Sequence, residues 1–419
     1  MSGSSGVHVH SMIAQCAWWV YTGVMSSSHS PSSNWWLYVA LITVTATGPL
    51  ALNMFMPSIP GLVSDLSTTV GMAQLTLTLY LAGSAVSQLV YGPLSDHFGR
   101  RPVLLAGITV FVLASIMCAL ATTIKILVIA RLLQAFGGAA GMVLTRAIIR
   151  DMHDEKASAS VIGYITMAWA VAPMVAPALG GYLDQLAGWR TSFWALAAFG
   201  ALALTLATFC LPETNHMQAA NAHQSRLAGY NRLLHNHRYI WLVATLAFTS
   251  GVFFAFLGGA PFIMIYVLNQ SPLAYGLWFS AVAIGYMTGN FISGKFSRTT
   301  ETGTMIAIGI TVATIATLIP FIAALNGALT PALIFIPMGI VAIGNGITLP
   351  NLTAASLSCD PKAIGSAAGL AGFIQSAAGA LVAQAVGVLQ PGMPLIAIWL
   401  MMTGAILSSV AYLFVVYKK

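Results

Sequence analysis

The charged residues that could act together in this chain lie between long apolar runs. Residues 92–104 read GPLSDHFGRRPVL, a short turn rich in charge inside a chain that otherwise avoids it. Asp96 and Arg100 stand four positions apart, a spacing at which two side chains pair on a helix. Arg150 and Asp151 close another apolar run. We therefore expect one charge cluster that holds a gate closed in one state, formed by Asp96, Arg100, Arg101 and Asp151.

The same turn contains Gly92 and Gly99. Residues without a Cβ let neighbouring segments approach closely, so both glycines are predicted to serve the gate. The alternative is an ordinary solvated loop whose charges only set the topology of the chain.

One charge, Arg131, lies inside an apolar run, about two turns from its start. A guanidinium in hydrocarbon costs several kcal/mol unless it faces protein or water, which marks it as a candidate functional residue. Gln134 lies one turn further along, and Asn345 interrupts another apolar run. We predict that these three residues line a cavity. The alternatives are that Arg131 extends to the surface and that the amides only hydrogen-bond neighbouring helices.

The chain contains nine acidic residues and nine histidines, and none of them falls deep within an apolar run. The four cysteines have neither metal-site nor redox spacing. We expect no metal and no cofactor. Intramembrane catalysis would need such residues at depth, so an enzyme is disfavoured. No phosphate-binding glycine loop is present, so ATP is not the expected energy source.

Composition places the whole chain in a membrane. Of its 419 residues, 58% are hydrophobic and 6% are charged, and the mean hydropathy is +0.86. Soluble domains carry about 25% charged residues. Lipid requires every backbone polar group to be paired, and apolar runs of about 20 residues predict spanning helices. The predicted fold is therefore an all-α integral membrane protein.

Twelve apolar runs can be placed along the chain. They span residues 36–58, 71–94, 102–123, 126–148, 160–183, 191–211, 239–262, 273–295, 303–324, 330–352, 363–387 and 393–416.

Basic residues predict the orientation of these runs. With the first helix leaving the cytoplasm, most of the sixteen basic residues fall on cytoplasmic segments, and only Lys125 and Arg190 fall on the other side. This asymmetry follows the positive-inside rule and predicts that both termini are cytoplasmic. Because the basic residues are scattered over separate loops, the net charge of +7 does not indicate nucleic-acid binding.

The chain divides into four predicted parts. Residues 1–34, rich in Ser and Gly at both ends, are expected to form a disordered or interfacial extension. Residues 35–211 form a first six-helix bundle, and the polar segment 212–238 forms a cytoplasmic linker. Residues 239–417 form a second six-helix bundle. The turn after the second run is weakly repeated after the eighth, with Ser293, Phe296 and Arg298 in the places of Ser95, Phe98 and Arg100. Two such halves with a site between them are a plan that transporters use.

The turn at residues 92–104 resembles the G-x-L-x-D-x-x-G-R-R/K signature of the major facilitator superfamily. Further motifs, from Asn53-Met-Phe-Met-Pro-Ser-Ile-Pro60 through RLLQAFG at residues 131–137 to APMVAPALGG at residues 172–181, are similar to the Bcr/CflA branch of drug exporters. The resemblance implies twelve helices in the inner membrane, a central cavity, and proton-driven efflux of bicyclomycin- or chloramphenicol-like drugs by a protein that works as a monomer. It also implies a coupling or substrate-binding role for Arg131.

The resemblance implies an antiporter motif on the fifth helix, formed by Pro173, Pro177, Gly180 and Gly181. Simple helix packing is the alternative reading of that motif. One departure concerns coupling: where relatives carry an Asp at the end of the first helix, this chain has Asn53, which cannot take up a proton. We therefore expect a neutral to positive cavity. A proton carrier would have to be a peripheral carboxylate such as Asp65, Asp151 or Asp184, unless Arg131 acts through bound water.

Three classes of function remain after these arguments. The first is an exporter of small, neutral, antibiotic-like molecules by proton antiport. The second is a metabolite exporter or facilitator with weak or different ion coupling, which the missing carboxylate favours. The third, a membrane enzyme or sensor, has neither deep catalytic groups nor a soluble domain to support it.

Overall fold

The computed structural model describes residues 35–152, 165, 172, 175–214, 232–297, 299–360 and 364–417. The predicted extension at 1–34, most of the predicted linker and most of the predicted fifth helix lie outside the described residues.

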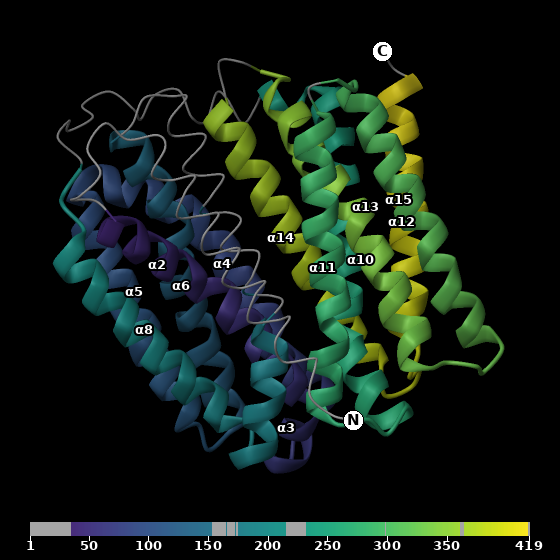
Figure 1. Cartoon of the computed structure of the whole chain (residues 1–419), viewed down its shortest axis with the longest axis horizontal. Helices are drawn as coiled ribbons and strands as arrows, with labels where there is room; N and C mark the ends of the chain where they lie inside the picture. The colour runs from purple at the N-terminus through teal and green to yellow at the C-terminus, as the bar shows by residue number, and fades with distance from the viewer. Residues whose placement is uncertain are drawn as a thin grey trace, which may run out of the picture.

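The first bundle consists of long helices that follow the predicted apolar runs (Figure 1). A short 3₁₀ turn, η1 (Met56–Ser58), and α3 (Ile59–Asp65) continue the first helix, and residues 175–187 are also helical. The long helices are α2 (Trp35–Met54), α4 (Val70–Phe98), α5 (Arg100–Ala119), α6 (Ile124–Met152) and α8 (Arg190–Cys210).

The second bundle repeats this construction (Figure 1). A π-helical turn, η2 (Ile263–Val267), extends its first helix. The long helices are α10 (His237–Phe262), α11 (Pro272–Phe296), α12 (Thr302–Leu325), α13 (Pro331–Leu357), α14 (Ile364–Leu389) and α15 (Ile396–Tyr417).

These helices have the length and composition of membrane spans. Within the described residues, ten of them are long and apolar enough to cross a bilayer. Helix α11 matches the predicted run 273–295 and has 25 residues, but it is not among those ten.

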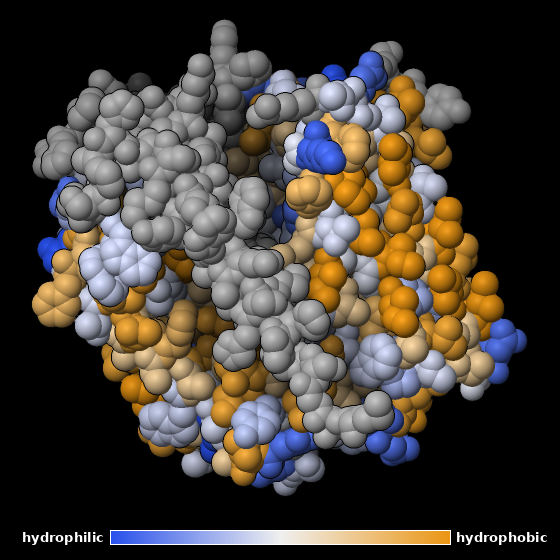
Figure 2. Space-filling model, viewed as in Figure 1, coloured by the Kyte–Doolittle hydropathy of each residue, from blue (hydrophilic) through white to orange (hydrophobic). Residues whose placement is uncertain are grey.

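The outer surface confirms the membrane assignment. Figure 2 shows hydrophobic residues over the flank of the second bundle, with hydrophilic residues at its two ends. Large apolar side chains such as Phe291 and Leu381 are about 70% exposed, at 69% and 73%. A water-soluble protein would rarely leave so many large apolar groups uncovered, whereas lipid accepts them.

Glycine contacts repeat between the bundles. In the first bundle α5 and α6 meet at Gly107 and Gly137, and in the second α12 and α13 meet at Gly309 and Gly344. A Cβ on Gly137 or on Gly344 would overlap the backbone of the facing helix, so the approach depends on glycine. The same pairing of the third with the fourth long helix in each half confirms the pseudo-repeat.

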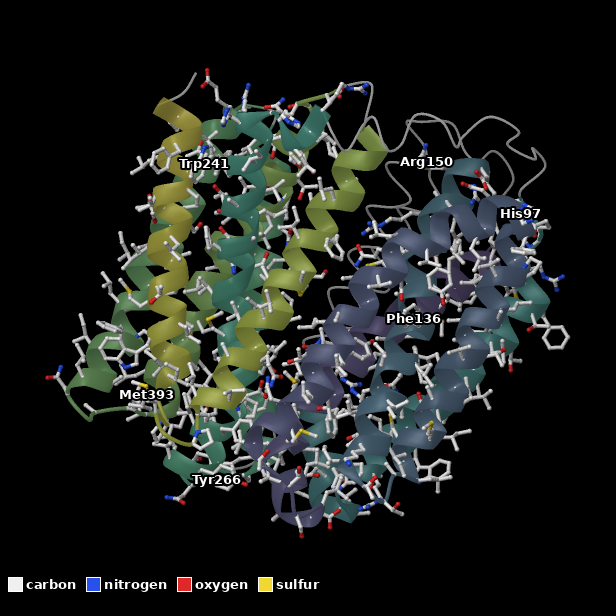
Figure 3. The ribbon with its side chains drawn as sticks, turned by 180° about the vertical axis from the view of Figure 1, so that it is seen from behind. His97, Phe136, Arg150, Trp241, Tyr266 and Met393 are labelled. Atoms are coloured by element: carbon white, nitrogen blue, oxygen red, sulfur yellow. The ribbon has the colours of Figure 1, made fainter. Side chains whose placement is uncertain are left out.

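The two bundles diverge toward one end of the molecule. At that end, the carboxyl-terminal face, lie the chain's C-terminus, His97 and Arg150 (Figures 1 and 3). Tyr266 and Met393 lie at the other end, the opposite face (Figure 3). The Tyr266 hydroxyl donates to the Pro60 carbonyl of the other bundle at 2.7 Å, so the bundles meet at the opposite face.

Candidate functional site

Arg131 is held inside the first bundle by oxygen acceptors from three helices. Its side chain is fully buried. Nη1 donates to the carbonyl of Ala51 on α2 at 3.0 Å and to Oε1 of Gln134 at 2.7 Å, and Nε donates to the carbonyl of Thr76 on α4 at 3.3 Å. The alternative in which Arg131 extends to the surface is therefore wrong, because the guanidinium points into the bundle.

Aromatic rings complete the surroundings of this guanidinium. Its central carbon lies 4.3 Å from the ring centroid of Tyr80, 5.3 Å from that of Phe55 and 5.8 Å from that of Phe193. Ring faces attract cations, and more strongly when water is excluded. Within the described part of the chain no carboxylate pairs with Arg131. Among the described residues, neutral dipoles and rings are what balance the charge.

Gln134 connects this centre to a further helix. Its Nε2 donates to the Ser115 hydroxyl of α5 at 2.8 Å, and that hydroxyl donates to the Phe111 carbonyl at 2.7 Å. Gln134 is fully buried, so it positions Arg131 and does not face a cavity in this state.

Asn53 and Asn345, the other two predicted cavity residues, are each 3% exposed and lie in different bundles. The Asn53 amide nitrogen donates to the Pro49 carbonyl at 2.8 Å, one turn earlier in α2. The side-chain oxygens of Asn53 and Asn345 have no hydrogen-bond partner among the described residues. Asn53, Arg131 and Gln134 therefore share one bundle, and Asn345 is apart from them.

The predicted charge cluster forms at the carboxyl-terminal face, where Arg100 is its centre. Arg100 Nη1 contacts Asp96 Oδ1 at 2.6 Å, and Arg100 Nε contacts Asp151 Oδ2 at 2.9 Å. The Ser95 hydroxyl accepts from the same Nη1 at 2.6 Å. The cluster joins α4, α5 and α6 within the first bundle, and no described ion pair links it to the second bundle.

Two residues predicted to serve the gate do not behave as expected. Arg101 points away and donates from Nη2 to the Thr208 carbonyl of α8 at 2.7 Å, because it follows Arg100 directly and so faces another side of α5. A Cβ on Gly92 would meet no atom within 4 Å, so close approach does not require that glycine. Position 99 does require glycine, since its φ of +96° is a backbone conformation that residues with a Cβ rarely adopt.

The sequence interpretation missed Glu213, which caps α5. One carboxylate oxygen accepts the backbone N–H of Arg100 at 3.0 Å, and the other accepts that of Arg101 at 3.1 Å. Acidic groups at helix N-termini satisfy free N–H groups and complement the helix dipole. The only signal in the sequence was a lone acid directly after an apolar run.

Replacing Glu213 with Gln tests this cap. We expect the free energy of unfolding to fall by roughly 1 kcal/mol because the charge and one acceptor are lost. Thermal unfolding in detergent measures the effect. Glu301→Gln is the matched control, since Glu301 also precedes a helix but its side chain makes no capping bond. Equal losses in both variants would contradict the capping role.

The fifth-helix motif lies against both bundles. Pro173 is outside the described residues. A Cβ on Gly180 would overlap the Met54 carbonyl of α2, and one on Gly181 would overlap Pro272 at the start of α11. The backbone around Pro177 in turn contacts Gly276 of α11. The motif thus forms a seam between the halves at the opposite face, whatever its role in antiport.

Of the candidate proton carriers, Asp65 and Asp151 are already paired. Asp65 accepts from the Trp189 indole at 2.7 Å and from Arg190 at 2.8 Å, and Asp151 is bound by Arg100. Asp184 is partly buried and forms no ion pair with a described residue.

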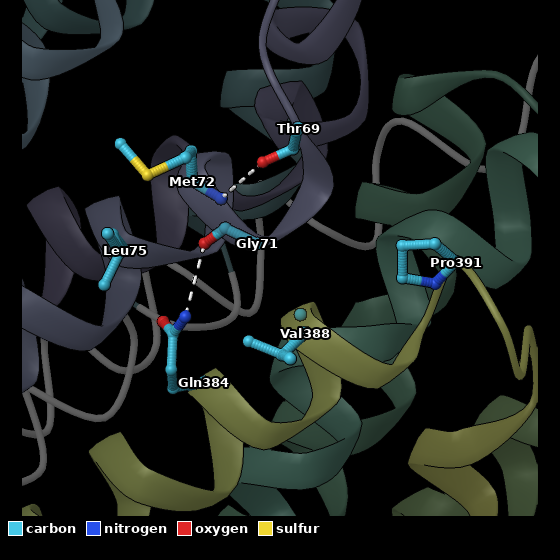
Figure 4. Close-up of a pocket in the computed structure, with 8 residues that line it drawn as sticks. Thr69, Gly71, Met72, Leu75, Gln384, Val388 and Pro391 are labelled. Carbon is cyan, nitrogen blue, oxygen red and sulfur yellow. Dashed lines mark hydrogen bonds between the residues drawn. The ribbon is translucent and has the colours of Figure 1, made fainter.

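A groove of about 340 Å³ lies where α4 meets α14 (Figure 4). Gln384 of α14 crosses it, donating from Nε2 to the Gly71 carbonyl at 3.4 Å and accepting from the Thr78 hydroxyl at 2.9 Å. Its lining is mostly apolar, and it is formed by Thr69, Gly71, Met72, Leu75, Gln384, Gly387, Val388 and Pro391.

Comparison with known proteins gives a consistent result. The model of the Major Facilitator Superfamily matches residues 41–383. The bicyclomycin resistance protein homolog of Haemophilus influenzae is 27% identical over 380 residues, which cover 88% of this chain and 94% of that protein. The chloramphenicol resistance protein of Pseudomonas aeruginosa is 36% identical over 259 residues, covering 59% and 60%. The solved D-xylose–proton symporter has the same fold, with a TM-score of 0.72 at 17% identity over 90% of this chain and 97% of that one.

Proposed function

The chain belongs to the major facilitator superfamily, and on this premise we propose that it exports small, neutral, antibiotic-like molecules across the cytoplasmic membrane by proton antiport. Its similarity to proteins named for bicyclomycin and chloramphenicol resistance supports a membrane transporter of the antibiotic or multidrug type. We further propose that it works as a monomer with both termini in the cytoplasm. In that topology the carboxyl-terminal face, where the halves diverge, is the cytoplasmic side.

The observation that carries the preference for neutral substrates is the charge balance around Arg131. The buried charge at Arg131 is positive, and Asn53, where an acid could have stood, is neutral. A cationic drug would meet no buried negative charge there, and desolvating an unpaired cation is costly. Neutral molecules avoid that cost.

Proton coupling then requires a carboxylate outside the centre of the bundle. Asp184 suits this role better than Asp65 or Asp151, because basic side chains are already paired with the other two. Asp184 follows Gly180 and Gly181 by one turn, so a proton on it would affect the seam between the halves.

Efflux from everted vesicles with and without an imposed pH gradient tests the proposal, using radiolabelled chloramphenicol and a cationic dye. We expect gradient-dependent movement of chloramphenicol and not of the dye. Movement of neither compound, or movement indifferent to pH, would contradict it. That outcome would favour the second candidate, a metabolite exporter or facilitator with weak or different ion coupling, which the neutral Asn53 supports.

Replacing Asn53 with Asp tests the argument about the missing acid. A carboxyl at this buried site would add a negative charge that is absent in the wild type, and when ionised it would attract cations. We therefore expect Asn53→Asp to increase export of the cationic dye from everted vesicles. Dye export that stays at the wild-type rate, with normal protein in the membrane, would show that position 53 does not select charge.

A further inference from the structure

Gln74 of α4 is a buried amide that makes no hydrogen bond to any described residue, and it lies where the two bundles meet. It is fully buried, and neither its Nε2 nor its Oε1 has a hydrogen-bond partner among the described residues. A buried amide that makes no hydrogen bond destabilises the state that buries it.

Backbone of the second bundle surrounds this side chain. A Cβ on Gly387 of α14 would overlap Cβ and Cγ of Gln74, and a Cβ on Gly258 of α10 would lie 3.0 Å from its Nε2. Glycine at both positions lets the side chain enter. It also means that no side chain is present at either position to donate or accept a hydrogen bond.

The neighbouring polar residues of the contact are satisfied, in contrast to Gln74. Gly71, Gln74 and Thr78 lie three or four positions apart, so they share one face of α4. Gly71 and Thr78 both bond to Gln384 across the contact. The contact therefore contains bonds that favour closure at the opposite face and, at Gln74, one group that opposes it.

We propose that Gln74 sets the equilibrium between the two states of the transporter by opposing closure of the opposite face. When the bundles separate there, Gln74 leaves Gly258 and Gly387, and its amide gains hydrogen bonds to water. The inference rests on the proposed function only in requiring that the halves alternate between two arrangements. It does not depend on the substrate or on the coupling ion.

The test measures distance and not transport. Spin labels are placed at exposed positions of the opposite face, Ser64 in the first bundle and Ala328 in the second, after the four natural cysteines are replaced by alanine. We expect the wild-type protein to show a short and a long distance. Gln74→Met keeps the length and flexibility of the side chain without its amide. This substitution should raise the ratio of the population with the short label-to-label distance to that with the long one about ten-fold, equivalent to about 1.4 kcal/mol.

Gln390→Met is the matched control. The Gln390 side chain is also buried with an unpartnered oxygen, but its nitrogen donates to Pro394 at 2.7 Å and it faces Gly259 within its own bundle. It should leave the ratio unchanged, and Gln74→Leu should reproduce the shift if the methionine variant is poorly produced. A wild-type protein that shows only the short distance, or an unchanged ratio in both Gln74 variants, would overturn the proposal. Failure of drug export alone would leave the distance result intact and would count against the proposed function instead.

Discussion

Replacing Arg131 with Ala is expected to abolish transport and to destabilise the first bundle. The change removes three hydrogen bonds to buried acceptors and a cation held among three aromatic rings. Loss of a large buried side chain together with charge-assisted hydrogen bonds costs on the order of 3–5 kcal/mol. Thermal unfolding in detergent and drug efflux in everted vesicles measure the two effects.

Arg131→Lys separates the charge from its geometry. Lysine keeps the charge but has no planar guanidinium with which to bind Ala51, Thr76 and Gln134 together. We therefore expect Arg131→Lys to recover part of the stability that Arg131→Ala loses, but little of the transport. Lys125→Ala is the control, because it removes a positive charge from an exposed position of the same helix and should change neither property. Efflux by Arg131→Ala at the wild-type rate would show that the buried guanidinium is dispensable.

The surroundings of Arg131 show what sequence could not provide. The depth of Arg131 in its apolar run marked it as unusual, and Gln134 one turn away was predicted to line a cavity with it, not to bind it. The ring of Phe55 comes from the turn after α2, and those of Tyr80 and Phe193 come from α4 and α8, so only the packed bundle brings them together. Aromatic residues are common in apolar runs, so nothing local identified these three.

The helices themselves could be predicted well because the bilayer fixes their length. The predicted run 273–295 became α11 at Pro272–Phe296, and the run 303–324 became α12 at Thr302–Leu325. The pairing at the centre of the charge cluster could also be predicted, because Asp96 and Arg100 are one helical turn apart. Glu213 was missed because it reaches α5 from more than a hundred positions away in the sequence.

Gln74 illustrates a different limit. Its sequence context, an amide near the start of an apolar run, is the same as that of an amide that lines a cavity. Whether this amide can form hydrogen bonds depends on Gly258 and Gly387 of the other bundle. They bury it in a place where no described residue bonds to it. Such a feature can be recognised only when the halves are seen together.

Replacing Gly276 with Ala is expected to prevent the halves from closing at the opposite face. A Cβ at this position of α11 would overlap the backbone of Pro177 and Ala178 on the fifth helix. Backbone cannot move aside as a side chain does, and overpacking costs about 1–3 kcal/mol. Since about 1.4 kcal/mol is a factor of ten, the closed state should become roughly 5- to 150-fold rarer. Transport, which needs that state, should fall with it.

The same helix provides a control for this substitution. Gly294 of α11 has no atom within 4 Å of its Cβ position, so Gly294→Ala meets no obstacle and should be neutral or slightly stabilising, because Ala favours helix more than Gly does. The spin-label distance between Ser64 and Ala328 reports closure, and drug efflux reports transport. If Gly276→Ala closes and transports as Gly294→Ala does, the seam at Pro177 is not a contact on which the cycle depends. If only Gly276→Ala remains open, the fifth-helix motif acts through the close approach of its backbone to that of α11, and Gly276 is needed there for its size.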